Sequence, residues 1–193
     1  WKKFMDEVIV YCFREEVVKH PRSRQLLAFV PTIFSETEAS PKEEELIDLC
    51  RRERKRGRKV SVYTTYTGTR DTTSRLKRML ETNGFKTAVL RSSVDTMRRE
   101  DWIMEQVDRG VEVLITNPEL VKTGLDLLDF PTIVFMTTGY NVYTLQQASR
   151  RSWRIGQKQD VDVYFFGYAD TAQITCLTLM AKKRPVISVL SYF

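Results

Sequence analysis

The segment Val60–Tyr66 reads Val-Ser-Val-Tyr-Thr-Thr-Tyr, and this run of β-branched and aromatic residues predicts a β-strand. It is followed by Asp71–Asn83, in which apolar residues recur at helical spacing up to the stop signal at Gly84. The same alternation continues along the chain. The other predicted strands are Thr87–Leu90, Val111–Thr116, Thr132–Met136 and Val161–Phe166, and the other predicted helices are Asp95–Arg109 and Thr171–Lys183. Strands that alternate with helices of about 10–15 residues predict a parallel sheet covered on both faces, so we expect an α/β fold.

A further helix is predicted just upstream of this alternation. Ser40 is suited to be its N-cap, Pro41 to occupy its first turn, and Glu43 to close a capping box. Gly57 provides a stop signal for the same helix. We therefore place the main domain at residues 40–193.

Residues 1–39 are predicted to form an N-terminal arm. Apolar and aromatic residues recur at helical spacing over Trp1–Lys19, which predicts a helix. Arg24–Phe34 is apolar but contains Pro31, which predicts an extended piece. We expect the aromatic stripe to be packed as core rather than to bind a ligand. Because the chain begins at Trp1 rather than Met, we also expect it to be part of a longer protein.

The composition is typical of an intracellular globular protein. The 193 residues are 42% hydrophobic, enough for one substantial core, and the net charge of +6 permits nucleic-acid binding without demonstrating it. Three widely spaced cysteines argue against a disulfide framework or a zinc site and favour a reducing compartment. No apolar run is long enough to cross a membrane, so we expect no membrane partner. The expected location is the cytoplasm and nucleoid of a bacterium or the nucleus of a eukaryote.

Positive charge is concentrated first in Arg51–Lys59, where seven of nine residues are basic. A charge run at the end of a helix is favoured by the helix dipole and is usually solvated. A contact with nucleic acid is the alternative for this run, and the sequence leaves both open.

A second basic cluster lies in Gln147–Gln157, which reads Gln-Ala-Ser-Arg-Arg-Ser-Trp-Arg-Ile-Gly-Gln. On a helix, Arg150, Arg151 and Arg154 would be neighbours, and like charges at these spacings cost about 0.2–0.5 kcal/mol per pair. We therefore expect an anion to offset them. The planar donor fork of a guanidinium suits phosphate oxygens better than lysine does, although a solvated basic face is the alternative.

The stretch Gln147–Gln157 resembles the sixth motif of superfamily-2 helicases, in the form found in Swi/Snf-type translocases (Q-A-x-x-R-x-x-R-I-G-Q). The resemblance implies a RecA-like, three-layer α/β/α domain of the P-loop NTPase type that forms the second lobe of a two-lobed ATP-driven motor. It also implies that Arg151 and Arg154 are arginine fingers on the γ-phosphate of ATP, with Gln147 in the same catalytic motif.

The stretch Ile115–Leu127 resembles the fifth motif of the same family and reads Ile-Thr-Asn-Pro-Glu-Leu-Val-Lys-Thr-Gly-Leu-Asp-Leu. The resemblance implies that Thr116 contacts a nucleic-acid phosphate and that Gly124 allows a close backbone approach to nucleotide. Asp126 would accept a hydrogen bond from the ribose or orient an arginine. Without the resemblance, Thr-Gly-Leu-Asp would be an ordinary turn with an Asp cap.

The segment Leu90–Val94, followed by Arg99, resembles the family's L-D-G-S-T…R segment, whose backbone and hydroxyl groups meet a DNA strand. The resemblance implies nucleic-acid contacts for Ser93 and Arg99. Arg91 and Ser92 depart from the family pattern, because they replace its Asp and Gly.

Thr64 and Thr65 occupy the position of the family's fourth motif, at the end of the first strand of the alternation. Hydroxyl groups there suit contacts with phosphate, which position nucleic acid without reading its sequence. A threonine-rich strand end without a binding role is the alternative.

The chain has neither a Walker loop (G-x-x-x-x-G-K-[ST]) nor an acidic pair after a strand to hold magnesium. ATP and Mg²⁺ are therefore expected to be held mainly by an absent first lobe, so this lobe alone should be inactive as an ATPase. The expected partners are the N-terminal RecA-like lobe of the same polypeptide and nucleic acid, with Arg-Ile-Gly-Gln favouring double-stranded DNA. Two alternatives stay open. One is a non-catalytic nucleic-acid- or protein-binding module, and the other is a stand-alone phosphate-binding enzyme, for which no nucleophile, general base or metal cluster is recognisable.

Overall fold

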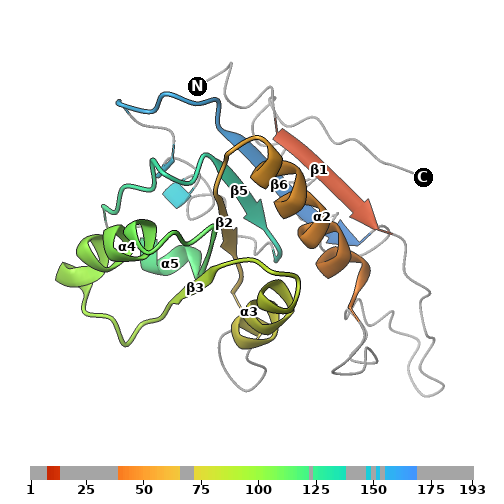
Figure 1. Ribbon diagram of the computed structural model, residues 1–193, viewed down its shortest axis with the longest axis horizontal. Helices are drawn as coiled ribbons and strands as arrows, with labels where there is room; N and C mark the ends of the chain where they lie inside the picture. Colours follow the sequence, from red (N-terminus) through yellow and green to blue (C-terminus); the bar gives the residue numbers. More distant parts are fainter. Residues whose placement is uncertain are drawn as a thin grey trace, which may run out of the picture.

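The computed structural model describes residues 8–13, 39–65, 72–121, 124–137, 147–148, 151–152 and 155–168. The strands are β1 (Val8–Phe13), β2 (Val60–Tyr63), β3 (Thr87–Leu90), β4 (Val113–Thr116), β5 (Thr132–Phe135) and β6 (Asp162–Tyr168). Within this part of the chain, six strands form one sheet in the order β1-β6-β5-β2-β4-β3, and every neighbouring pair is parallel (Figure 1). The carboxyl ends of all strands therefore meet at one edge, here called the carboxyl edge.

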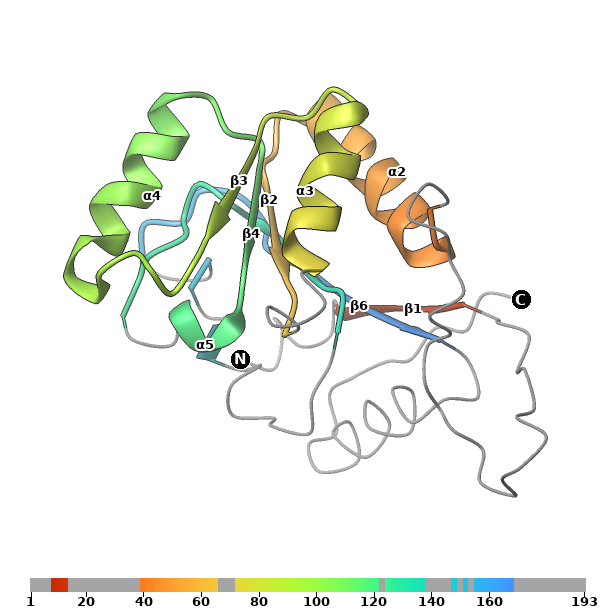
Figure 2. The ribbon, with the colours of Figure 1, turned by 90° about the horizontal axis from the view of Figure 1, so that it is seen from below.

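Helices cover both faces of this sheet. They are α2 (Pro41–Lys55), α3 (Thr72–Thr82), α4 (Arg99–Asp108), which follows the 3-10 turn Thr96–Arg98, and the short α5 (Pro118–Val121). Helices α2 and α3 lie on one side of the strands and α4 on the other (Figure 2). Each face has its own core: Leu46, Leu76 and Leu80 belong to one cluster, and Ile103 and Val121 belong to the other. The observed three layers confirm the predicted α/β class.

Strand β2 shows how one strand serves both cores. Val60 and Val62 pack in the cluster beneath α2 and α3, whereas Tyr63 points into the opposite cluster, as the two-residue period of a strand requires. The Tyr63 ring stacks on Phe135 at a centroid distance of 5.0 Å, and Phe135 stacks on Phe165 at 4.8 Å. This aromatic row joins β2, β5 and β6 under the carboxyl edge.

Local start and stop signals are confirmed. Ser40 is the N-cap of α2, its backbone N–H donates to the Glu43 carboxylate at 2.7 Å, and its side chain accepts from the backbone of Glu43. Gly57 and Gly84 adopt φ of 69° and 79°, a left-handed conformation that favours glycine at a helix end. Strand β3 has the bounds expected from the sequence, and β2, β4, β5 and β6 differ from the expected bounds by a few residues at their ends.

Three expectations for the secondary structure need correction. The helix expected over Trp1–Lys19 is wrong at Val8–Phe13, which is a strand paired with β6, so this part of the expected arm belongs to the sheet. The helix expected over Asp95–Arg109 begins as a 3-10 turn, and α5 was not predicted. The arginine-bearing stretch is not helical at Arg151–Ser152 or Ile155–Gly156, which form turns.

The helix expected over Thr171–Lys183 lies outside the described residues. Among the described helices, none has both the length and the apolar character needed to cross a membrane.

Candidate functional site

The carboxyl edge is held together by hydrogen bonds between strand ends. Thr64 directly follows β2, and its backbone N–H donates to the Thr116 carbonyl at the end of β4, with an N–O distance of 3.1 Å. On the other side of β2, the Thr65 backbone N–H donates to the Thr137 hydroxyl at 2.9 Å, and the two hydroxyl groups lie 3.0 Å apart. The end of β2 is thus bonded to the ends of both neighbouring strands. The connections between strands diverge here to the two sides of the sheet. Ligands of open α/β sheets bind at such a switch point.

The loop that follows β4 and α5 carries Gly124 and Asp126, and we call residues 124–130 the glycine loop. Gly124 is exposed and has φ of 105°, and a Cβ placed there would meet no atom within 4 Å. The position therefore requires glycine for its backbone conformation and leaves open space beside the main chain. Asp126 is half-buried.

The described residues of 147–157, here called the arginine loop, are hydrogen-bonded to the glycine loop. The backbone N–H of Leu127 donates to the Arg151 carbonyl at 2.9 Å, and the Arg151 N–H donates to the Ala148 carbonyl at 3.2 Å. The hydroxyl of Tyr63, the last residue of β2, donates to the same Ala148 carbonyl at 3.4 Å. These bonds join the main chain at Ala148 and Arg151 to the loop that carries Gly124 and Asp126. The site roles of Gln147, Arg151, Gly124 and Asp126 stay predictions.

Arg151 is largely enclosed, with 8% of its surface exposed. Its positive charge acts on the Tyr63 hydroxyl: burial raises the pKa of Tyr63, and the Arg151 charge opposes that rise. The neighbouring Ser152 hydroxyl is fully buried and has no hydrogen-bond partner among the described residues. A guanidinium held in a low-dielectric site attracts an anion more strongly than one in water. Arg154 and Arg150 lie outside the described residues.

The described residues of this site suit an anionic group such as a phosphate. Arg151 supplies a fixed cation, and Gly124 leaves the backbone accessible. In the part of the chain that the structure describes, no three His, Cys, Asp or Glu side chains form a group that could hold a metal ion.

Of the predicted nucleic-acid contacts, Thr65 and Ser93 are exposed at the carboxyl edge, whereas Thr64 and Thr116 are fully buried. The Thr116 hydroxyl lies 3.4 Å from the Leu90 carbonyl, to which it donates. The Thr64 hydroxyl has no hydrogen-bond partner among the described residues. The roles of Thr65 and Ser93 therefore stay predictions, and Thr116 serves the junction of β3 and β4 in this structure.

Arg99, another of the predicted nucleic-acid contacts, is bonded within the lobe. It is 8% exposed, and its guanidinium donates to the Val94 carbonyl at 3.2 Å and to the Leu120 carbonyl at 3.1 Å. These bonds tie the loop after β3 to α5. Arg99 therefore braces the lobe in this structure, and its contact with nucleic acid stays a prediction.

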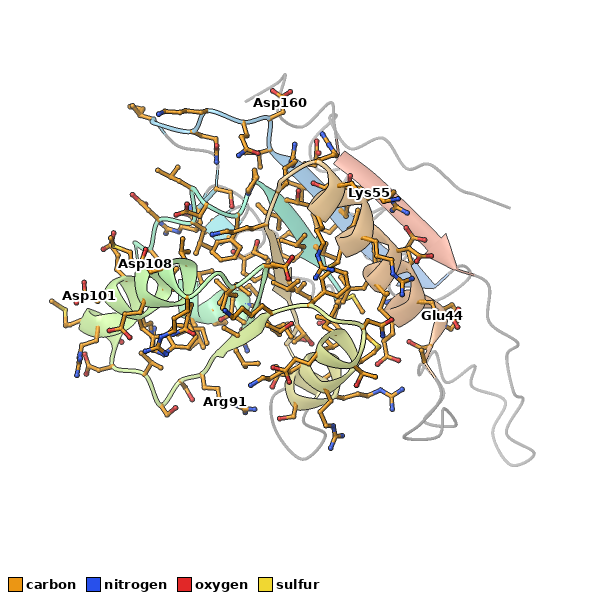
Figure 3. The ribbon with its side chains drawn as sticks, in the orientation of Figure 1. Glu44, Lys55, Arg91, Asp101, Asp108 and Asp160 are labelled. Carbon is orange, nitrogen blue, oxygen red and sulfur yellow. The ribbon has the colours of Figure 1, made fainter. Side chains whose placement is uncertain are left out.

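Arg91, which replaces the family's Asp, lies at the end of β3 and reaches α3, where its guanidinium donates to the Ser74 hydroxyl at 2.8 Å (Figure 3). Ser92 and Ser93 beside it are exposed. This segment therefore presents a cation and two hydroxyl groups, a combination that suits a phosphate backbone.

The basic run Arg51–Lys59 is largely neutralised within the lobe. Five of its seven basic residues form ion pairs with N–O distances of 2.6–2.8 Å: Arg51 with Asp48, Arg52 with Glu45, Arg54 with Glu112, and both Arg56 and Arg58 with Glu53. The run lies at the end of α2, around the labelled Lys55, where β2 begins rather than where it ends (Figure 3). This pairing favours a structural role over a contact with nucleic acid.

One residue that holds the site together was given no role by the sequence. The Gln157 side-chain amide donates to the Leu128 carbonyl and to the Ser152 carbonyl, each at 2.9 Å, so it joins the glycine loop to the arginine loop. Its place at the end of Arg-Ile-Gly-Gln marked it as part of a motif, but only the tertiary structure shows what it contacts.

The all-parallel sheet, covered on both faces and with two joined loops at its carboxyl edge, has the architecture of nucleotide-binding α/β proteins. The model of the helicase conserved C-terminal domain matches residues 41–156, more than half of the chain. The chain therefore belongs to the helicase C-terminal domain family, which confirms the resemblance to the second RecA-like lobe of superfamily-2 helicases. A comparison with curated protein sequences found no match.

Solved structures agree with this assignment. The C-terminal part of the Fun30 ATPase domain matches with a TM-score of 0.67 and 20% identity, over 73% of this chain and 45% of that one. A DEAD box protein from the hyperthermophile Methanococcus jannaschii matches with a TM-score of 0.64 and 14% identity, over 100% and 43%. Dbp5 from S. cerevisiae, bound to RNA and ADP BeF3, matches with a TM-score of 0.64 and 15% identity, over 97% and 41%. At these identities the likeness shows the RecA-like fold alone, and the chain spans less than half of each solved chain.

Proposed function

We propose that this chain is the second lobe of an ATP-dependent helicase or translocase and that Arg151 and Arg154 are its arginine fingers. ATP, held with Mg²⁺ mainly by a first lobe of the same polypeptide, would supply the γ-phosphoryl group on which negative charge develops. The lobe alone would not hydrolyse ATP. Gln147, Gly124 and Asp126 would complete the nucleotide-facing surface of this lobe.

The observation that carries the proposal is the bonded pair of loops at the carboxyl edge. Arg151 is held through its own carbonyl by Leu127, and its N–H is fixed on Ala148, which Tyr63 also holds. A finger acts by placing a cation where charge develops, so its value depends on such preorganisation. Arg151 is moreover only 8% exposed, whereas a basic residue that serves only solubility is solvated.

The same edge would grip the nucleic-acid backbone, through Thr65, Ser93 and Arg91. These residues follow β2 and β3, and Thr65 and Ser93 are exposed. Contacts of this kind bind phosphates and do not read sequence, as a motor that moves along its track requires. Double-stranded DNA is the proposed partner, because the sequence Arg-Ile-Gly-Gln resembles the motif of double-stranded DNA translocases. An intracellular location follows from that partner.

The test is nucleic-acid-stimulated ATP hydrolysis by the full-length protein that carries this lobe. Arg151→Ala and Arg154→Ala should lower kcat at least about 100-fold, since an arginine finger contributes about 10³–10⁵ in rate. Nucleotide affinity should change little. Because Arg151 is buried, Arg151→Lys is measured as well, and it should also lose most of the rate because it lacks the planar fork.

Arg109→Ala is the matched control. Arg109 caps the far end of α4 and is 66% exposed, with an ion pair to Glu105 at 3.6 Å. It should leave hydrolysis unchanged. Unchanged hydrolysis in the Arg151 and Arg154 variants, with salt-sensitive nucleic-acid binding retained, would instead favour a non-catalytic binding module.

A further inference from the structure

The Gln157 side chain makes three hydrogen bonds within the site. Its amide nitrogen has two hydrogens, and they go to the Leu128 and Ser152 carbonyls at 2.9 Å each. Its amide oxygen accepts from the Gln159 backbone N–H at 2.9 Å. The side chain is half-buried, so these carbonyls are shielded from much of the solvent that would otherwise compete for them. The side chain is therefore fixed in orientation as well as in place.

These bonds extend a short ladder between the two loops. Leu127 donates to the Arg151 carbonyl, and Gln157 spans the next pair along, Leu128 and Ser152. The carbonyl groups of Arg151 and of Ser152 are thus both held, the first by the glycine loop and the second by a side chain bound to that loop. These two bonds fix the main chain that directly follows the Arg151 side chain.

The turn before Gln157 is built to direct its side chain inward. Gly156 has φ of 103°, a conformation that L side chains rarely adopt, and a Cβ there would lie 3.8 Å from the Leu128 side chain. Ile155, by contrast, is fully exposed. The reversal at Gly156 leaves Ile155 outside and brings Gln157 back against the glycine loop.

From this geometry we infer that Gln157 is a positioning residue, which acts through Arg151 by locking the arginine loop to the glycine loop. The inference rests on the proposed function, because it concerns where Arg151 is held. It assigns to Gln157 an effect on the rate of phosphoryl transfer with no contact to nucleotide. A displacement of a catalytic group by about 1 Å can lower a rate about 100-fold.

The experiment uses the full-length protein and the variants Gln157→Glu and Gln157→Met. Glu keeps the length and the acceptor but, when ionised, faces two carbonyls with no hydrogen to donate. Met keeps the approximate shape and makes none of the three bonds. For both variants we expect kcat to fall about 10- to 100-fold at neutral pH, with KM for ATP within about twofold of the wild type.

A pH series separates positioning from a loss of structure. The protonated carboxyl of the Glu variant regains one donor, and facing carbonyl oxygens raise the pKa of a carboxyl. Its rate relative to the wild type should therefore rise as pH falls from about 8 to about 5.5, whereas the Met variant should show no such recovery. Gln159→Glu is the matched control, because Gln159 is exposed and contributes only its backbone N–H to this network.

An equal loss for Gln157→Glu at every pH, or a raised KM with unchanged kcat, would overturn the inference. So would rates like those of the wild type in both variants while Arg151→Ala is inactive in the same assay. If Arg151→Ala itself retains full activity, the proposed function fails, and the two failures are therefore distinguishable. If Gln157→Glu does not fold, the kcat and KM of Gln157→Met decide the matter.

Discussion

Replacing the buried carboxylate of Glu53, which lies opposite the carboxyl edge of the sheet, should destabilise the fold more than removing a surface charge would. Glu53, at the end of α2, is 1% exposed and pairs with Arg58 at 2.8 Å and with Arg56 at 2.8 Å. It also accepts from the Thr132 hydroxyl at the start of β5. Arg58 pairs in turn with Asp162 of β6 at 3.0 Å. One buried group therefore joins α2 to two strands.

The magnitude for Glu53→Gln follows from what the change leaves behind. Breaking a buried ion pair costs about 3–5 kcal/mol, chiefly because the partner stays buried without its counter-charge. Here Arg58 retains Asp162, which lowers the cost, and the pair with the half-exposed Arg56 adds little. We therefore expect a loss of about 2–3 kcal/mol in the free energy of unfolding. For a domain of this size that lowers Tm by about 5–10 °C.

Thermal unfolding of the chain, followed by circular dichroism, measures this loss. Asp48→Asn is the matched control, because Asp48 also pairs with an arginine of α2 at 2.8 Å but both side chains are more than half exposed. It should change stability by about 0.5 kcal/mol or less. A Tm for Glu53→Gln within about 1 °C of the wild type would refute the reasoning, since it would mean that the buried charge contributes nothing that Asp162 cannot replace.

Two further predictions concern groups with altered pKa values. Burial, with the charge of Glu53 acting in the same direction, raises the pKa of the Cys50 thiol to about 12, so iodoacetamide should modify Cys50 only after unfolding. Peptide mapping of native and urea-treated samples checks this, and rapid labelling of the native chain would contradict it. Burial disfavours the charged form of Glu43, but hydrogen bonds from Arg75 and Ser40 outweigh it and lower the pKa of Glu43. Its stabilising effect should therefore be present above its unfolded pKa of about 4.3 and be lost as pH falls through the lower folded value. The stability difference between wild type and Glu43→Gln, measured by urea unfolding, should then be largest near neutral pH and disappear in acid; a difference independent of pH would contradict this origin.

Local chemistry explains why much of the fold could be predicted from the sequence. The capping box of Ser40 and Glu43 and the left-handed glycines at helix ends depend on residues a few positions apart. The error at Val8–Phe13 has a different cause. Its apolar spacing suits a helix, but its β-branched and aromatic residues also suit a strand, and pairing with β6 decides between them. That partner lies more than 150 residues away, so a local pattern could not reveal it.

The candidate site was predictable as a set of motifs but not as a set of contacts. Motif position predicted that Arg151 and Gly124 belong to one site, and the bond between Leu127 and Arg151 joins the two loops that carry them. It could not show that Arg99 turns toward the Leu120 carbonyl, because α5 was itself not predicted. Nor could it show that Gln157 carries the bonds between loops, since its partners are main-chain carbonyls, which any residue type would provide.

The aromatic row under the carboxyl edge has a mechanical consequence. Tyr63 belongs to the stacked rings of the core, and its hydroxyl is also bonded to the main chain of the arginine loop. The loop is thus bonded directly to a side chain of the packed core. Under the proposed function, the distance between Arg151 and its target would be set by motion of the entire lobe, and a pull on the guanidinium would be passed straight into the sheet. Under that function, each opening and closing of the cleft between the two lobes would carry Arg151 together with the sheet.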